Sequence, residues 1–342
     1  MDPELVYGSA MRVLTGPQIR AAVPMETAIA AMRSAFAQRA LEEVEAPLRT
    51  VLTTPHGHLL VMPAWLGGSG DLAVKLVSVV PGNPERGLPR VLGLVALFDP
   101  VTGSPRAVLH GATVTALRTA AVTGLATDLL ARPDARTLAI VGAGALAADQ
   151  IAAVCSVRSI AEVRVYAPTH SHAQAACRGV RNARATATVA EAIRGADIVV
   201  TVTTSVDPVF DDADLAPGAH IVAVGAWRPE LCEIPSVTVR RARVFVDDRV
   251  AATTESGDLI RAGVGPGDVA GDLAELVLAR AAGRTSDAEL TLFESVGLAI
   301  EDAALAGAVV EVAEQKGIGT VADFGDSPRP ELVGARQSGD HP

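Results

Sequence analysis

The chain has 342 residues, a formal net charge of −10 and a hydrophobic fraction of 49%. This length favours two domains over one, and an acidic chain without a basic run is not expected to bind nucleic acid. No stretch reaches the roughly 18–20 apolar residues that cross a bilayer, and we find no export signal, so we expect a cytoplasmic protein without a membrane partner. The three cysteines, Cys155, Cys177 and Cys232, are far apart and predict neither a disulfide framework nor a metal site.

The first third of the chain predicts helices around a set of antiparallel strands. Apolar residues recur at three- and four-residue spacing from Met25 past Phe36, which predicts a helix. Four or five strand-like runs follow between residues 48 and 111, separated by turn sequences such as PGNPERGLP and DPVTGSP. A second, long helix is expected to begin near Thr113 and to end before RPDAR.

From Thr137 onward, strand-like and helix-like runs alternate. This alternation predicts an α/β fold with a parallel sheet covered on both faces. After Asp258 we expect helices, among them the run DAELTLFESVGLAIEDAALAGAVVEVAEQKG. The tail from Gly325 is polar and contains Pro and Gly, which predicts disorder over residues 325–342.

A glycine-rich turn marks the expected cofactor site. In TLAIVGAGALA, a GxGxxA pattern of Gly142, Gly144 and Ala147 follows an apolar strand and opens a helix. Such glycines allow a tight turn and bring backbone N–H groups close to a pyrophosphate at the helix N-terminus. The turn residues Gly142, Ala143, Gly144, Ala145 and Leu146 are therefore candidate dinucleotide ligands, the alternative being a turn needed only for packing.

The end of the next strand bears on the choice of dinucleotide. A carboxylate there would accept hydrogen bonds from the adenosine ribose, but EVRVYA ends at Ala167 and continues PTHSH. Thr169 and His170 are able to donate to a 2′-phosphate, so the sequence favours NADP(H) over NAD(H), although no arginine follows. The alternative is an ordinary solvated turn that caps a helix.

Lys75 is unusual for this chain. Only two of the 29 basic residues are lysines, and Lys75 stands inside the apolar run DLAVKLVSVV. A lysine on an edge strand would serve to discourage aggregation. A lysine buried in such a strand would instead have an environment that tunes its pKa, as in active sites.

Several motifs occur together in one order: VMPAW, LAVKLVSVVPGNPERGLP, VTALRTAAVTGLA, IVGAGALA and TLFESVGLAIED. In this combination the chain resembles the ornithine cyclodeaminase/mu-crystallin family over residues 12–322. The resemblance implies a Rossmann-type doubly wound parallel sheet over residues 126–302. It also implies a smaller α+β substrate-binding and dimerisation domain, formed by residues 1–125 with 303–324, and hence a homodimer.

The resemblance also assigns roles to single residues. It makes Lys75 the catalytic lysine, Arg49 and Arg118 the ligands of a substrate carboxylate, and Met62 a pocket-lining residue. His110 stands where many members carry Asp or Met, so it is either a proton donor near the substrate or a strand-end histidine satisfied by backbone. The positions that match cofactor-lining residues are Thr119, Thr203, Thr204, Ser205, Val224, Gly225, Ser295, Val296 and Gly297.

One departure from the family pattern bears on the reaction. Cyclodeaminases resemble one another in a GxD segment with an acid/base aspartate, whereas this chain reads VGAWRPELCEI, with Trp227 at that position and Glu230 nearby. An indole cannot exchange the proton that cyclodeamination requires. We therefore expect an NAD(P)H-dependent reductase of a cyclic ketimine or 2-imino acid, reversible as an amino-acid dehydrogenase. The alternatives are an ornithine or lysine cyclodeaminase, a non-catalytic small-ligand binder, and an enzyme that joins two amino acids by reductive amination.

Overall fold

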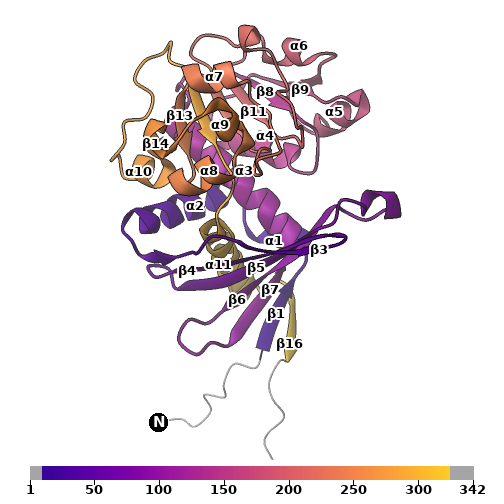
Figure 1. Cartoon of the computed structure of the whole chain (residues 1–342). Helices are drawn as coiled ribbons and strands as arrows, with labels where there is room; N and C mark the ends of the chain where they lie inside the picture. The colour runs from indigo at the N-terminus through magenta and orange to yellow at the C-terminus, as the bar shows by residue number, and fades with distance from the viewer. Residues whose placement is uncertain (1–9, 324–342) are drawn as a thin grey trace, which may run out of the picture.

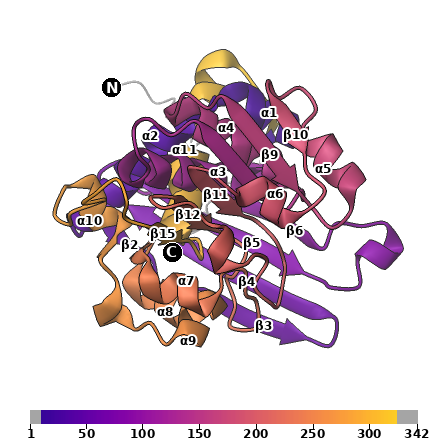
Figure 2. The same ribbon diagram turned by 90° about the horizontal axis from the view of Figure 1, so that it is seen from above.

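The computed structural model describes residues 10–323, and the predicted disorder of residues 325–342 lies outside this range. The described residues form two lobes, each built on an eight-stranded sheet (Figure 1). We call the lobe that contains strands β1 and β16 in Figure 1 the lower lobe, and the other the upper lobe. Seen from above, strands β3 to β6 of the lower sheet extend past the upper lobe on one side (Figure 2).

The lower sheet has the strand order β16-β1-β7-β6-β5-β4-β2, with β3 paired to β4. Its strands from β2 to β7 pair antiparallel, which confirms the predicted meander. The short strands β1, β2 and β16 were not expected from the sequence. The strand bounds are β1 (Ala10–Leu14), β2 (Val44–Glu45), β3 (Thr50–Thr54), β4 (Gly57–Leu66), β5 (Asp71–Val79), β6 (Val91–Phe98), β7 (Pro105–His110) and β16 (Thr320–Asp323).

Helices cover one face of the lower sheet. Helix α11 (Ala299–Lys316) packs on strands β4, β5 and β6 and against α2 (Met25–Ala40). The first turn of α2 confirms the helix predicted from Met25, and α3 (Gly111–Leu130) confirms the second predicted helix. The short helix α1 (Gly16–Ala22) precedes α2, and one 3-10 turn, η1 (Pro84–Arg86), lies between β5 and β6.

The upper sheet is parallel throughout, in the order β10-β9-β8-β11-β12-β15-β13-β14. The strand order reverses between β8 and β11, the point at which such sheets bind ligands. The strands are β8 (Thr137–Val141), β9 (Glu162–Tyr166), β10 (Ala183–Ala185), β11 (Ile198–Thr201), β12 (His220–Ala223), β13 (Arg243–Val246), β14 (Gly271–Asp272) and β15 (Thr291–Glu294). The helices are α4 (Ala147–Val157), α5 (His170–Ala176), α6 (Val189–Ile193), α7 (Ser236–Arg241), α8 (Arg249–Glu255), α9 (Gly257–Ala262) and α10 (Leu273–Val277), with 3-10 turns η2 (Asp212–Asp214) and η3 (Pro266–Asp268).

One element was predicted wrongly. The run from Asp287 to Gly317 was expected to be helical, but its residues Thr291–Glu294 form strand β15 between β12 and β13. All four residues of β15 are buried. A strand covered on both faces lacks the apolar-polar alternation that distinguishes strands from helices in sequence.

Besides a second core within the upper lobe, one hydrophobic core extends through both lobes. Its buried side chains come from both sheets and from α3, which packs on α2 of the lower lobe and on α4 of the upper lobe. Both predicted domain boundaries, at residues 125/126 and 302/303, fall inside helices, α3 and α11. Helix α3 thereby carries Arg118 to the junction between the lobes.

Candidate active site

Lys75 lies at the centre of the lower sheet. Strand β5 is flanked by β4 and β6, and Lys75 stands directly opposite Met62 and Val95. The edge-strand interpretation is therefore wrong. Lys75 is 3% exposed, and its Nζ lies 2.6 Å from a carboxylate oxygen of Asp302 on α11. Burial lowers the pKa of Lys75 to about 8, even though Asp302 acts to raise it.

Arg118 lies beside Lys75 and shares its acids. Its Nη1 donates to Glu301 at 2.7 Å, and its Nε lies 3.4 Å from Asp302. Burial opposes the charge of Arg118, but Glu301 and Asp302 raise its pKa above the usual value. We call Lys75, Arg118, Glu301 and Asp302 the buried charge cluster.

The sequence analysis missed both acids of this cluster. Glu301 and Asp302 lie in the first turn of α11, where acidic residues are common because they favour the helix N-terminus. Glu301 does have such a role, because its Oε1 accepts from the backbone N–H of Leu298 at 2.8 Å. The available signal was Lys75 itself, because a lysine buried in an apolar strand requires a buried acid.

The loop Ser295–Gly297 seats the guanidinium of Arg118. Gly297 has a φ of +80°, and a Cβ there would lie 2.3 Å from Arg118 Nη1. Asp247 fixes this loop, because its carboxylate accepts from the backbone N–H groups of Val296 at 2.8 Å and Gly297 at 2.7 Å. Burial raises the pKa of Asp247 to about 7.

Arg49 reaches the same loop from the lower lobe. Its Nη2 donates to the carbonyl oxygens of Val296 at 3.2 Å and Gly297 at 2.9 Å, and it lies 2.8 Å from Glu255 at the end of α8. A cavity of about 30 Å³ between the lobes is lined by Arg49, Glu255, Gly297 and the buried Met62. The structure therefore brings Arg49, Met62, Lys75 and Arg118 to one junction between the lobes.

The glycine turn has the geometry of a phosphate-binding turn. Gly142 has a φ of +112°, and a Cβ there would lie 2.5 Å from the carbonyl oxygen of Val202, so the turn requires glycine. A Cβ at Gly144 would meet no atom within 4 Å, so this part of the turn faces open space ahead of α4. These properties fit a pyrophosphate against the backbone of residues 142–146.

The other predicted cofactor positions follow strand ends at the same edge of the sheet. Thr203 to Ser205 come after β11, Val224 and Gly225 after β12, and Ser295 to Gly297 after β15. Thr119 follows Arg118 on α3 and is buried. Carboxyl ends of parallel strands meet at one edge, so the sheet topology collects these residues around the switch point.

A buried acid that the sequence analysis did not identify holds two of these loops. Glu233 accepts from the backbone N–H groups of Thr203 at 2.5 Å and Gly225 at 2.7 Å, and from the Thr201 hydroxyl at 2.9 Å. Burial raises the pKa of Glu233 to about 7. The sequence points to Glu230 in this segment because it lies near Trp227, but Glu230 is exposed. No local pattern distinguishes the two glutamates.

The end of β9 is the place where a ribose-binding carboxylate would lie. Ala167 follows β9 and is buried, Thr169 precedes α5 and His170 is its first residue. Thr169 and His170 are both exposed, and the Thr169 side chain makes no capping hydrogen bond to α5. The position that would carry a ribose-binding carboxylate is thus an alanine, followed by free polar side chains.

His110 is not brought to the site. Lys75, Val95 and Leu109 share one face of the lower sheet, whereas His110 pairs with Leu94 and therefore lies on the opposite face. Its Nδ1 accepts from the backbone N–H of Thr113 and caps α3. The expectation that His110 faces the substrate is corrected in favour of the strand-end role.

Trp227 lies at the edge of the hydrophobic core of the upper lobe. It is half-buried, packs against the apolar residues of that core and has the Arg228 guanidinium over its ring at 4.8 Å. No titratable group therefore occupies the position of the cyclodeaminase aspartate.

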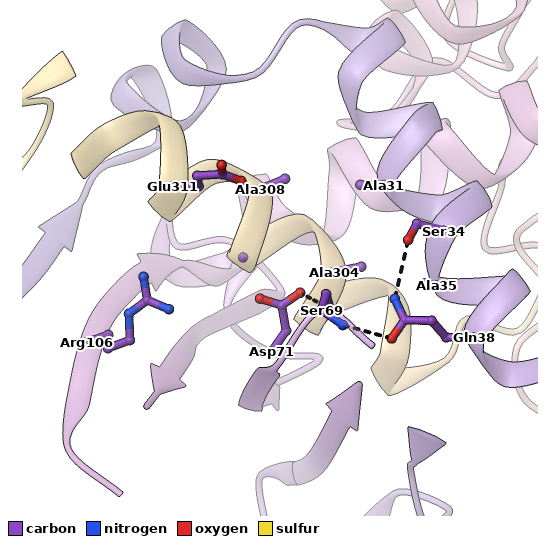
Figure 3. A pocket seen from close by; sticks show the side chains of 11 residues that line it. Ala31, Ser34, Ala35, Gln38, Ser69, Asp71, Arg106, Ala304, Ala308 and Glu311 are labelled. Carbon is purple, nitrogen blue, oxygen red and sulfur yellow. Dashed lines mark hydrogen bonds between the residues drawn. The ribbon is translucent and has the colours of Figure 1, made fainter. Parts of the chain in front are cut away.

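A larger cavity, of about 440 Å³, lies elsewhere in the lower lobe, between α2, α11 and the start of β5 (Figure 3). In it, Ser69 donates to Asp71 at 2.6 Å and its backbone N–H donates to Gln38 at 3.2 Å. No member of the buried charge cluster lines this cavity.

The described residues 10–323 contain neither a metal-binding cluster nor a membrane-spanning helix. Over this range, no group of three or more His, Cys, Asp or Glu side chains is arranged to hold a metal ion. In the same part of the chain, every helix is too short or too polar to cross a membrane.

Comparison with known proteins assigns the chain to a family. The sequence profile of the ornithine cyclodeaminase/mu-crystallin family matches residues 10–317. The chain is 37% identical to a Δ1-pyrroline-2-carboxylate reductase from Bacillus cereus over 326 residues, covering 92% of this chain and 100% of that protein. The chain therefore belongs to the ornithine cyclodeaminase/mu-crystallin family.

Solved structures agree with this assignment. The structure of Thermococcus litoralis Δ1-pyrroline-2-carboxylate reductase in complex with NADH and L-proline matches with a TM-score of 0.87 at 36% identity, over 91% of this chain and 99% of that one. An archaeal alanine dehydrogenase dimer with bound NAD matches with a TM-score of 0.86 at 33% identity, over 92% and 99% of the two chains.

Proposed function

We propose that the protein is an NAD(P)H-dependent reductase of a cyclic ketimine or 2-imino acid, reversible as an amino-acid dehydrogenase. The observation that carries this proposal is the junction of the lobes. There, Lys75 and Arg118 lie buried beside the loop Ser295–Gly297, at the edge of a parallel sheet with a phosphate-binding turn. The two relatives named as Δ1-pyrroline-2-carboxylate reductases, from Bacillus cereus and Thermococcus litoralis, carry the name of a cyclic imine substrate of this class.

The upper lobe supplies the cofactor site in this proposal. The turn Gly142–Leu146 binds the pyrophosphate, and the residues after β11, β12 and β15 line the remainder, with the reduced nicotinamide supplying the hydride. We further propose that NADP(H) is preferred over NAD(H), because Ala167 offers no carboxylate and Thr169 and His170 are free to donate.

The predicted substrate-binding domain, residues 1–125 with 303–324, supplies the substrate site in this proposal. Arg49 and Arg118 bind the substrate carboxylate through their planar guanidinium groups, which orients the adjacent imine carbon. Lys75 donates the proton that the imine nitrogen gains, and a pKa near 8 suits a donor at neutral pH. Asp302 holds the ammonium in place at 2.6 Å.

The lower sheet also supports a homodimer. Its face away from α11 exposes Leu59, Trp65, Leu92 and Leu94, which the strand pairing places on one side. An exposed apolar sheet face of this kind is expected to be covered by a partner. A second copy of this chain is the proposed cover, and the alanine dehydrogenase neighbour is a dimer. Light scattering at micromolar concentration should give a dimer mass, and a monomer mass would contradict this part of the proposal.

A paired assay tests the reaction. We expect the protein to oxidise NADPH or NADH in the presence of pyrroline-2-carboxylate or piperideine-2-carboxylate, and to release no ammonia from ornithine or lysine. Ammonia release without external cofactor consumption would identify a cyclodeaminase despite Trp227. Ligand binding with neither reaction would identify a non-catalytic binder.

A further inference from the structure

Each cation of the proposed substrate site already has its own carboxylate. Lys75 lies 2.6 Å from Asp302, Arg118 lies 2.7 Å from Glu301, and Arg49 lies 2.8 Å from Glu255. A ligand with only a carboxylate would therefore add an uncompensated negative charge. A ligand that carries both a carboxylate and a protonated nitrogen would add no net charge.

Of the three acids, Glu255 has the most exposed side chain. Its side chain is 21% exposed, whereas those of Glu301 and Asp302 are 0% and 2% exposed. Glu255 also lines the cavity between the lobes, together with Arg49. That cavity has room for about one or two water molecules, so an amino acid can enter only if its lining moves.

The surroundings of Glu255 make it sensitive to a second negative charge. Burial raises its pKa, Arg49 lowers it and the nearby Asp248 raises it. Asp248 is itself paired with Arg39. In the described part of the chain, Arg49 is the basic residue within 4.0 Å of the Glu255 carboxylate. Two carboxylates on this one guanidinium would repel each other across a few ångströms in a partly dry site.

We propose that Glu255 is a specificity-determining residue: it shares Arg49 with the ligand carboxylate and makes the site select zwitterionic ligands over plain carboxylates. The inference rests on the proposed function, because it takes Arg49 as a ligand of the substrate carboxylate. A protonated amine beside Glu255, as in the amino-acid form of the ligand, restores the balance of charge. A plain carboxylate binds only if Glu255 turns away or takes up a proton.

A matched ligand pair tests this inference. L-proline and cyclopentanecarboxylate share a five-membered ring and a carboxylate, and differ in the protonated nitrogen. Their dissociation constants are measured by calorimetry on the NADH-loaded wild-type protein and on Glu255→Gln, which keeps the side-chain size. We expect Glu255→Gln to bind cyclopentanecarboxylate about 10-fold more tightly and L-proline no more tightly, as removal of a 1.4 kcal/mol repulsion predicts.

Two further variants make the result specific. Glu230→Gln removes the same charge from an exposed site in the same lobe, and both dissociation constants should stay within about two-fold. Glu255→Asp keeps the charge and should keep the discrimination against cyclopentanecarboxylate.

Two kinds of result would overturn the inference, and they have different meanings. If Glu255→Gln weakens the binding of both ligands equally, or changes neither dissociation constant, Glu255 only forms an ion pair between the lobes. The proposed function would then stand. If Arg49→Gln leaves both affinities unchanged, the assignment of Arg49 as carboxylate ligand fails, and the inference fails with it. Thermal unfolding of each variant confirms that the comparison is made on folded protein.

Discussion

Buried carboxylates perform different tasks in the two lobes. In the upper lobe, Glu233 and Asp247 accept from backbone N–H groups and thereby fix the loops after β11, β12 and β15. At the junction with the lower lobe, Asp302 and Glu301 face the cationic side chains of Lys75 and Arg118. Under the proposed function, the first pair shapes the cofactor site, and the second sets the charge and position of the groups that meet the substrate. Removing an acid should therefore affect cofactor binding in one case and proton transfer in the other.

The largest expected effect belongs to the charge cluster. Lys75→Met should lower turnover at least about 100-fold, because a positioned proton donor is lost. The variant also leaves the buried Asp302 carboxylate with only its longer contact to Arg118, so we expect destabilisation of about 3 kcal/mol, at the low end of the cost of breaking a buried pair. The double variant Lys75→Met/Asp302→Asn should recover most of the stability and none of the activity. Turnover within a few-fold of wild type in the single variant would make Lys75 structural.

The pH dependence of imine reduction should sharpen the same point. In the proposed function the protonated Lys75 is the donor; its pKa is about 8, so kcat should fall about 10-fold per pH unit above that value. Asp302 raises this pKa, so Asp302→Asn should move the falling limb to lower pH. Steady-state rates between neutral and alkaline pH measure the limb. An unmoved limb in Asp302→Asn would assign the titration to another group.

In the upper lobe, Glu233→Gln should weaken dinucleotide binding about 10-fold, within the 1–3 kcal/mol cost of an unsatisfied buried donor. The glutamine amide would face the N–H groups of Thr203 or Gly225, and those loops would shift. Fluorescence titration with NADPH and NADH measures the effect. The pH limb of kcat should stay in place, and a moved limb would contradict the separation of tasks between the lobes.

The smallest expected effect concerns the choice of cofactor. Ala167→Asp should shift the preference toward NADH by a few-fold to about 10-fold, because a carboxylate repels a 2′-phosphate and accepts from ribose hydroxyls. Direct titration of both cofactors against parent and variant decides the matter. Tighter binding of NADH than NADPH by the parent protein would refute the proposed preference.

The glycine turn and Lys75 could be identified from the sequence, but the buried acids that pair with the cationic side chains could not. The glycine turn and Lys75 stand out locally, because each is an exception to the composition around it. Glu301 and Asp302 do not stand out locally, because each pairs with a residue far along the chain. Arg118 and Glu301, for example, are 183 positions apart. Only the fold brings these pairs together.

The orientation of His110 can be predicted from the sequence by strand alternation. In β7, Ala107 and Leu109 are buried on the face that carries Lys75, so strand alternation alone turns His110 to the other face. β15 shows the opposite situation, since its four buried residues have no alternation to read. Periodicity therefore placed half-buried strands and failed for a strand covered on both sides.

The core shared through α3 has a consequence for how the molecule denatures. Because the same apolar cluster extends into both lobes, neither lobe can lose its packing without exposing part of the other. The chain contains two tryptophans, Trp65 in the lower lobe and Trp227 in the upper lobe. Single-tryptophan variants, Trp65→Phe and Trp227→Phe, let each lobe report separately on urea unfolding. Their fluorescence transitions should each coincide with the loss of helical circular dichroism in the same variant, so that substrate and cofactor lobes melt as one cooperative unit.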